Sequence, residues 1–226
     1  MIILDGKKLS EKILSNVAEE IRKKKPDLKL SLFLIGDSLV SKAYVNKKEK
    51  FCRSVGINFE LVNLSPDISE AELKNEIKKT ADDKNISGIV IQLPIPKKFN
   101  TQEILNLVPS KKDIDVLSET SFDKFSKNKL PAIPPVVGAV KYLFEEYNIP
   151  LKGKKIVLIG KGRLVGKPLS VWLSNNNADF VTLDKNVNDV SHFTKEADII
   201  ISGAGSPFLI KREAVKHGAV LVDVGT

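Results

Sequence analysis

The segment Lys155–Asn175 constrains the fold of this chain most, because a strand, a glycine-rich turn and a helix follow one another in it without a break. Four apolar residues from Ile156 to Ile159 lead into Gly160, and Gly166 opens a run of apolar residues at helical spacing. A buried strand that passes directly into a helix is the repeating unit of parallel sheets. The segment therefore predicts an α/β fold, with this turn at the carboxyl end of a parallel strand.

The glycines of this turn indicate a nucleotide site. The first can make a tight turn, the second lets backbone N–H groups approach a pyrophosphate, and the helix N-terminus adds partial positive charge. The spacing is G-x-G-x-x-x-G, one residue longer than the common pattern, and a plain strand–helix turn stays open as an alternative. We favour binding of a nicotinamide dinucleotide. The predicted cofactor-binding residues are Gly160, Lys161, Gly162, Arg163, Val165, Gly166 and Asp184.

The same residues leave the choice between NAD and NADP open. Asp184 ends the next predicted strand, where an acidic residue commonly bonds the adenosine ribose. Lys161, Arg163 or Lys185 could instead meet the 2′-phosphate of NADP. These two signals conflict.

Strand and helix patterns alternate along the whole chain, which predicts two α/β domains, at 1–135 and 136–226. The expected strands are 30–35, 57–64, 88–93, 155–159, 180–183, 198–202 and 219–224. The expected helices are 9–25, 41–55, 69–83, 136–148, 165–175, a short polar helix after 184, and 211–216. The polar, proline-containing stretch 109–135 is predicted to be a loop between the domains. The chain stops on an apolar strand without a covering helix, so we expect a Rossmann-like second domain that is incomplete at its C-terminus.

Composition narrows the class of partner. The net charge is +8, from 36 basic and 28 acidic residues, which suits small anionic ligands. Nucleic-acid binding is not expected, because the basic residues are spread out and are not interleaved with aromatic ones. One cysteine, Cys52, and two histidines exclude a disulfide within the chain and make a metal site improbable. We expect a soluble cytoplasmic protein without a signal sequence or a membrane span.

The first half contains polar residues at suggestive positions. Tyr44 and Lys48 stand four residues apart, which places a phenol and an ammonium group on one face of a helix. A lysine beside an aromatic ring can act as an acid or a base, although a solvated lysine beside a core tyrosine has the same spacing. Gln92 ends a buried strand, where α/β folds bind ligands. Asp113 and Asp115 could bind amino groups of a ligand or simply be hydrated.

Five segments together resemble the bifunctional methylenetetrahydrofolate dehydrogenase/methenyltetrahydrofolate cyclohydrolase family, in order and over essentially the whole chain. They are Tyr44-Val45-x-x-Lys48, Gly88-Ile89-Val90-Ile91-Gln92-Leu93-Pro94-Ile95-Pro96, Lys112-Asp113-Ile114-Asp115, Gly160-x-x-x-x-Val165-Gly166-Lys167-Pro168 and Gly218-Ala219-Val220-Leu221-Val222-Asp223-Val224-Gly225. The resemblance implies a folate-binding catalytic domain followed by an NAD(P)-binding domain, and a homodimer. It implies oxidation of 5,10-methylenetetrahydrofolate with NADP⁺, then hydrolysis of the methenyl product to 10-formyltetrahydrofolate.

The resemblance also implies residue roles. Lys48 would be the central catalytic residue, and Gln92 would hydrogen-bond to it and position it. Tyr44 would pack on the folate and align it, and Asp115 would bind the amino edge of the pterin. These roles make Lys48, Tyr44 and Gln92 the predicted catalytic residues, and Tyr44, Gln92 and Asp115 the predicted substrate-binding residues.

Four departures from the family pattern limit these expectations. Val116 replaces a glycine after Asp115, and Lys161-Gly162 replaces an Arg-Ser pair, which weakens the preference for NADP and keeps NAD as an alternative. Pro131–Pro135 replaces a Pro-Cys-Thr-Pro segment, and the family's C-terminal Pro-Gly-Gly-Val-Gly-Pro segment is missing. We therefore expect low or absent turnover. The competing hypotheses are a non-catalytic folate- or dinucleotide-binding protein, another two-domain dehydrogenase and a nucleic-acid-binding module.

Overall fold

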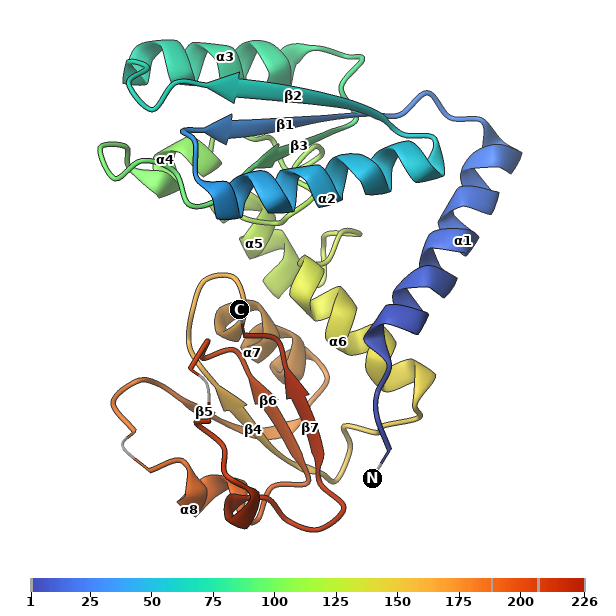
Figure 1. Cartoon of the computed structure of the whole chain (residues 1–226), viewed down its shortest axis with the longest axis vertical. Coiled ribbons are helices and arrows are strands. Elements are labelled where there is room, and N and C mark those ends of the chain that lie inside the picture. The colour runs from blue at the N-terminus through green and yellow to red at the C-terminus, as the bar shows by residue number, and fades with distance from the viewer. Residues whose placement is uncertain (1, 188, 207, 226) are drawn as a thin grey trace. The chain divides into compact units, whose positions relative to one another are not determined.

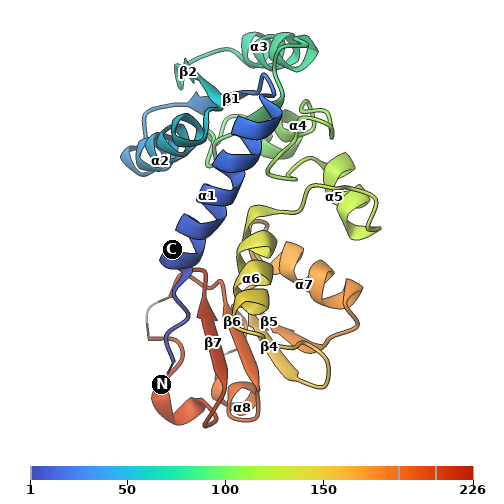
Figure 2. The same cartoon turned by 90° about the vertical axis from the view of Figure 1, so that its right-hand side faces the viewer.

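The computed structural model describes residues 2–187, 189–206 and 208–225 (Figures 1 and 2). The chain divides into two compact units, one of residues 5–133 and the other of residues 1–4 together with 134–226. Each unit contains a parallel sheet with helices packed on it, so the predicted two-domain α/β fold is confirmed. Among the described residues, no helix is both long and apolar enough to cross a membrane.

The unit of residues 5–133 is built on a three-stranded parallel sheet in the order β2-β1-β3. The strands are β1 (Lys29–Ile35), β2 (Asn58–Leu64) and β3 (Gly88–Ile91). The helices are α1 (Gly6–Lys24), α2 (Leu39–Val55), α3 (Glu70–Asp82), α4 (Thr101–Leu105) and α5 (Glu119–Ser126). Because the chain passes from β1 to β2 on one side and returns to β3 on the other, β1 is the strand at which the order reverses. Ligands of open α/β sheets bind at the carboxyl ends of the strands beside such a point.

Strand β1 is buried on both faces, as the continuous apolar sequence Leu32-Phe33-Leu34-Ile35 requires. Phe33 and Ile35 pack with residues of α3 and α4, such as Leu73 and Ile104. Leu32 and Leu34 pack with Val45 and Cys52 of α2. Successive side chains point to opposite faces of a strand, so α2 covers one face and α3 the other (Figure 1).

Local sequence explains the helix ends of this unit. Ser69 and Glu72 form a capping box at the start of α3, with Glu72 N–H donating to Ser69 Oγ and Ser69 N–H donating to Glu72 Oε2. Ser38 caps α2, so this helix begins at Leu39, two residues before the predicted start. The predicted helix near the N-terminus is present as α1, although none of its described residues is buried.

The prediction of an inter-domain loop at 109–135 is wrong for residues 119–126, which form α5. The Ser118 side chain caps this helix by accepting from Ser121 N–H, and the rings of Phe122 and Phe125 lie 5.9 Å apart. The short helix α4 was not predicted either, although Asn100 caps it. Both helices are too short for apolar periodicity to show in a polar sequence.

The second unit contains a four-stranded parallel sheet in the order β5-β4-β6-β7. The strands are β4 (Lys155–Ile159), β5 (Asp179–Leu183), β6 (Ile199–Ser202) and β7 (Val220–Asp223). The helices are α6 (Pro135–Glu146), α7 (Gly166–Asn175), α8 (Ser191–Thr194) and the 3₁₀ turn η1 (Arg212–Ala214), which replaces the helix expected at 211–216. Here β4 is the strand at which the order reverses.

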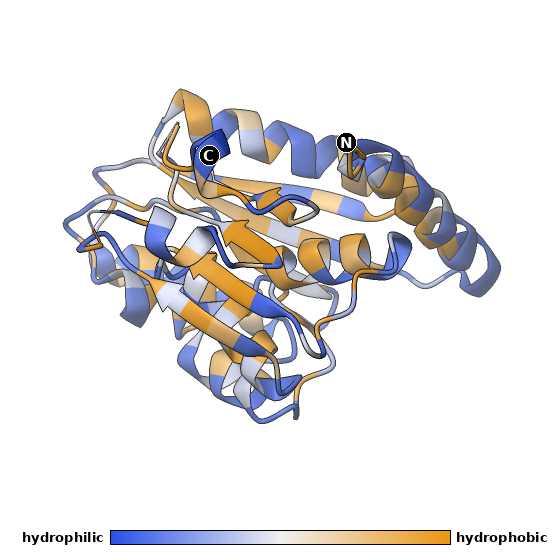
Figure 3. Ribbon diagram, turned by 90° about the horizontal axis from the view of Figure 1, so that it is seen from below, coloured by the Kyte–Doolittle hydropathy of each residue, from blue (hydrophilic) through white to orange (hydrophobic). Residues whose placement is uncertain are grey.

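The core of the second unit also has two sides. Val157, Ile159 and Ile200 pack with Val190 and Ala197, which flank α8. Helix α7 packs on β4 and β5 and also contacts α6, where the rings of Phe144 and Trp172 meet edge to face at 6.2 Å. Figure 3 shows the strands as mostly hydrophobic bands, whereas the helices carry hydrophilic residues on their outer faces.

Candidate active site and cofactor loop

Gln92 lies directly after β3, at the carboxyl end of the first sheet. Its backbone N–H still pairs with the strand partner, donating to Phe33 O at 2.9 Å. Its side-chain amide donates to Leu93 O at 2.8 Å, which orients the carbonyl oxygen Oε1 away from that contact. Oε1 accepts from Lys48 Nζ at 3.3 Å. The buried strand thus holds a fixed acceptor for the lysine.

Lys48 approaches this point from α2, and its side chain is 35% exposed. Its amino group lies 3.3 Å from Gln92 Oε1 and 3.4 Å from Asp115 Oδ2. Tyr44 precedes Lys48 by one helical turn and is 41% exposed, with Lys47 Nζ 5.7 Å from the centre of its ring. The aromatic ring therefore has an open surface on which a planar ligand can pack.

Asp115 reaches the lysine because its segment runs beside β3. Asp113 forms a parallel bridge with Ile89, and Ile89 N–H donates to Lys112 O at 2.7 Å. Two residues further along a parallel pair, Asp115 comes level with the end of β3, just before Gln92. Gly88 allows this approach, since a Cβ on it would lie only 3.0 Å from Ile114 Cγ2.

Burial raises the pKa of the Asp115 carboxyl above its ordinary value, and the nearby Asp113 adds to this. The charge of Lys48 and its hydrogen bond oppose the rise without cancelling it. Burial likewise raises the pKa of the Cys52 thiol, one turn after Lys48 in α2. The site thus combines an amino group, an amide oxygen and a carboxyl whose proton is held more tightly than usual.

The two aspartates of the Asp113–Asp115 segment differ in their surroundings. Asp115 faces Lys48, whereas Asp113 is buried and accepts from two backbone N–H groups, of Leu117 at 3.2 Å and of Ser118 at 2.8 Å. Asp113 is therefore engaged with its own loop. Residue type and spacing do not distinguish the two carboxylates; only the family resemblance singles out Asp115.

The cofactor loop of the second unit begins at Gly160, at the carboxyl end of β4. Gly160 has φ +104, in a region that side chains rarely adopt, and its N–H donates to Leu183 O at 2.7 Å. Gly166 starts α7, and a Cβ on it would collide with the carbonyl of Gly160. A Cβ on Gly162 would meet nothing within 4 Å, so its predicted role toward a pyrophosphate stays a prediction.

Gly203 contacts this loop from the neighbouring strand, and its role was not predicted from the sequence. It directly follows β6, and a Cβ on it would collide with the side chain of Val165. The close contact between Val165 and Gly203 thus fixes where α7 begins relative to the neighbouring strand. Its place in the sequence could have indicated this role. Strand β6 pairs in parallel with β4, so the residue after β6 lies at the same edge of the sheet as the glycine turn.

The predicted ribose acid and one predicted phosphate-binding lysine pair with each other. Lys161 Nζ lies 3.1 Å from Asp184 Oδ2, and Asn186 N–H donates to Asp184 Oδ1 at 3.0 Å. The bond from Asn186, followed by that from Lys161, lowers the pKa of Asp184. Arg163 is exposed on the same loop. The structure therefore brings Gly160, Lys161 and Asp184 together at one edge of the sheet.

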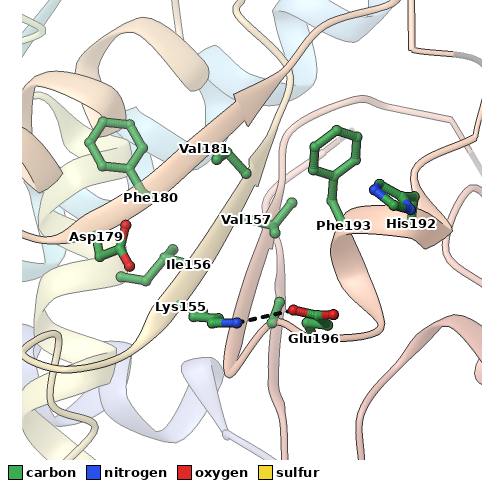
Figure 4. A pocket seen from close by; sticks show the side chains of 10 residues that line it. Lys155, Ile156, Val157, Asp179, Phe180, Val181, His192, Phe193 and Glu196 are labelled. Carbon is green, nitrogen blue, oxygen red and sulfur yellow. Dashed lines mark hydrogen bonds and ion pairs between the residues drawn. The ribbon is translucent and has the colours of Figure 1, made fainter.

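A separate pocket of this unit lies at the opposite ends of the strands (Figure 4). It is lined by residues that begin β4 and β5 and by residues of α8 and after it, including Phe180, His192 and Phe193. Lys155 and Glu196 form an ion pair of 3.0 Å across it. Because dinucleotides bind at the carboxyl ends of parallel strands, this pocket is not the cofactor site.

Comparison with known proteins places both units in one family. Residues 4–115 match the family described as tetrahydrofolate dehydrogenase/cyclohydrolase, catalytic domain, and residues 132–226 match its NAD(P)-binding domain. Proteins named bifunctional protein FolD from Hydrogenobaculum sp. and Helicobacter pylori are each 38% identical; the matches cover 100% of this chain and 82% and 79% of theirs.

Solved structures agree with these matches. A FolD methylenetetrahydrofolate dehydrogenase/cyclohydrolase from Campylobacter jejuni has a TM-score of 0.94 at 33% identity, covering 100% of this chain and 81% of that one. A Trypanosoma brucei FolD complexed with NADP and an inhibitor has a TM-score of 0.88 at 26% identity, covering 98% of this chain and 76% of that one. The chain belongs to the tetrahydrofolate dehydrogenase/cyclohydrolase family, and its second unit is the NAD(P)-binding domain of that family.

Proposed function

We propose that this chain oxidises 5,10-methylenetetrahydrofolate with NADP⁺ to the 5,10-methenyl form and hydrolyses that product to 10-formyltetrahydrofolate. The observation that carries the proposal is the amino group of Lys48, held between Gln92 Oε1 and Asp115 Oδ2. Membership of the family supports it. Residues 1–135 would act as the folate-binding catalytic domain, and residues 136–226 as the Rossmann-like cofactor domain.

In the first reaction, a C–H bond of the methylene bridge breaks and its electron pair leaves with the hydrogen as a hydride. When bound, NADP⁺ supplies the hydride acceptor. The bridge carbon becomes cationic, and its charge is shared with the two folate nitrogens. Tyr44 would align the folate by packing on it, and Asp115 would bind the amino edge of the pterin. A carboxylate has enough lone pairs to accept from both the substrate and Lys48.

In the second reaction, the oxygen of water bonds to the cationic carbon and one proton leaves the water. The bond from that carbon to N5 then breaks and N5 keeps the electron pair. The hydroxyl proton leaves for solvent as the carbonyl bond forms, and the formyl group stays on N10. Lys48 would act as the general base that accepts the proton from water and as the acid that returns one to N5. Gln92 would hold the amino group in line.

The glycine turn would bind the dinucleotide through Gly160, Gly162, Val165 and Gly166, with the helix N-terminus toward the pyrophosphate. Lys161, Arg163 and Asp184 lie where the adenosine ribose and its 2′-phosphate are expected. The close packing of Gly166 on the backbone of Gly160 and of Gly203 on the Val165 side chain supports this assignment, because it holds the turn tightly at the carboxyl end of β4.

Lys48→Ala tests the proposed function. Loss of a general base typically costs about 10²–10⁴ in rate, so hydrolysis of methenyltetrahydrofolate should fall by at least about 100-fold. Lys50→Ala, an exposed lysine on the same helix, should retain full activity. Both variants are assayed for reduced cofactor and for loss of the methenyl absorbance. If Lys48→Ala changes neither rate, the catalytic assignment is wrong. Retained folate and NADP binding without any turnover in the unsubstituted chain would favour a binding protein instead.

The family resemblance further implies a homodimer that works in the cytoplasm on a small folate, without nucleic-acid or membrane partners, and we propose both the assembly and the location. The +8 charge supports anionic small ligands, since the folate tail and the cofactor phosphates are negative.

A further inference from the structure

Asp113 is a buried acid that the proposed chemistry does not use. Its side chain is 5% exposed, and both of its oxygens accept backbone N–H groups further along the loop. Leu117 N–H donates to Oδ1 at 3.2 Å, and Ser118 N–H donates to Oδ2 at 2.8 Å. The carboxylate therefore closes a six-residue loop, 113–118, onto itself. Asp115 lies in the middle of that loop.

The loop contains a residue in an unfavourable conformation. Val116 has φ +57 and is 1% exposed. This left-handed region is costly for any L side chain, and especially for a β-branched one. Such a conformation persists only where its surroundings over-determine it. The two hydrogen bonds join Asp113, which precedes this turn, to Leu117 and Ser118, which directly follow Val116.

Both ends of this loop are fixed to regular structure. At its start, the backbone of Asp113 is bridged to Ile89 of β3. At its end, Ser118 caps α5, accepting from Ser121 N–H at 3.2 Å. With the ends held, the left-handed turn at Val116 fixes the course of the loop in which Asp115 lies. In the structure, Asp115 faces Lys48 at 3.4 Å.

We propose that Asp113 is a positioning residue for the reaction: its carboxylate holds Val116 in the left-handed conformation and thereby presents Asp115 to Lys48 and to the folate. The inference rests on the proposed function, because it assigns Asp113 to the same site. It also separates the two aspartates by task, since one holds the loop and the other meets the ligand.

Asp113→Asn removes one of the two acceptor oxygens and sets an amide N–H₂ against a backbone donor. The loop should then relax away from the strained conformation. We expect the KM for methylenetetrahydrofolate to rise about tenfold and kcat/KM for hydrolysis to fall to a similar extent, with the KM for NADP unchanged. The matched control is Asp123→Asn in α5, an exposed carboxylate that pairs with Lys127 and should leave all constants unchanged.

The decisive readout is rescue by a second substitution. Glycine adopts φ +57 without a steric penalty, so Val116→Gly should let the loop keep its shape without Asp113. The kcat/KM of the double variant Asp113→Asn/Val116→Gly should be at least threefold higher than that of Asp113→Asn. If Asp113 served stability alone, removing a buried valine would make the double variant worse, and that result would overturn the inference. Asp113→Glu, which keeps both oxygens but displaces them, offers the same rescue test if Asp113→Asn does not fold.

An Asp115→Asn background separates this inference from the proposed function. If Asp113 acts through Asp115, adding Asp113→Asn to Asp115→Asn should lower kcat/KM by less than twofold more. A full further tenfold loss would show that Asp113 acts elsewhere. If Asp115→Asn is itself silent while Lys48→Ala is impaired, the inference fails and the proposed function stands; if both are silent, both fail. If Asp115→Asn is impaired while Asp113→Asn is not, only the inference fails.

Discussion

At the scale of single residues, the site depends on one carboxyl whose surroundings raise its pKa above the ordinary value. Asp115 is 20% exposed, and burial outweighs the attraction of Lys48 in setting the direction of its pKa. A carboxyl with a raised pKa in the folded protein binds its proton more tightly there than in the unfolded chain. Folding is therefore favoured at acidic pH, and part of that stability is lost as pH rises through the folded pKa.

Asp115→Asn should show this linkage. The neutral amide does not titrate. The free energy of unfolding of the variant should therefore gain on that of the wild type as pH rises above about 4, the ordinary pKa of an aspartate, until the pH passes the folded pKa. The gain is about 1.4 kcal/mol for each unit by which the folded pKa is raised. Urea unfolding of both proteins at several pH values measures it. A difference that stays constant with pH, or shrinks as pH rises, would contradict the raised pKa.

Sequence reasoning reached some of these residues and not others. The four-residue spacing of Tyr44 and Lys48 predicts a shared helix face, and both lie on α2. That Gln92 and Asp115 approach Lys48 depends on pairing between β3 and a distant segment, which spacing cannot show. The role of Asp113 depends on the left-handed φ of Val116, and the sequence showed only that a valine stands where the family has glycine.

At the scale of elements, the strand–turn–helix unit of the second domain is fixed by backbone-to-backbone contact. Gly166 is the first residue of α7, and its Cα faces the carbonyl of Gly160. The sequence predicts this unit because the apolar strand residues, the glycines and the helix residues follow one another without a break. The short helices α4 and α5 escaped prediction because their stability comes from caps and tertiary packing.

Gly166→Ala should destabilise this element. A Cβ there collides with backbone atoms of Gly160 and Lys161, which cannot rotate away as a side chain would. We expect the free energy of unfolding to fall by about 1–3 kcal/mol, as for other overpacked sites. Gly162→Ala is the matched control for stability, because a Cβ there meets nothing within 4 Å, and it should stay within about 0.5 kcal/mol of wild type. Chemical denaturation compares the two; equal losses would refute the packing argument.

At the scale of the whole molecule, two parallel sheets repeat one arrangement. In each, the strand at which the order reverses lies beside the proposed ligand residues: β1 for Lys48 and Gln92, and β4 for the glycine turn. The alternation of strand and helix patterns was enough to predict this architecture, because short apolar strands and longer amphipathic helices follow one another along the chain. The assembly of chains cannot be read from that pattern, since it depends on surfaces and not on periodicity.

The proposed homodimer has a direct test. Sedimentation velocity or light scattering should give a mass twice the 25.0 kDa of one chain at micromolar concentration. A species that stays at the mass of one chain over the range in which the protein turns over would contradict the dimer.

The parallel bridge between Ile89 and Asp113 also bears on how the segment between them can vary. Because the bridge sets where the 113–118 loop begins beside β3, the number of residues between β3 and that loop does not set it. Insertions or deletions between 94 and 111 should be tolerated as long as the core residues of this stretch keep their places, which are Ile95, Phe99, Ile104, Leu105 and Val108. Homologous chains of unequal length in this stretch can therefore preserve the same constellation of ligand-facing groups.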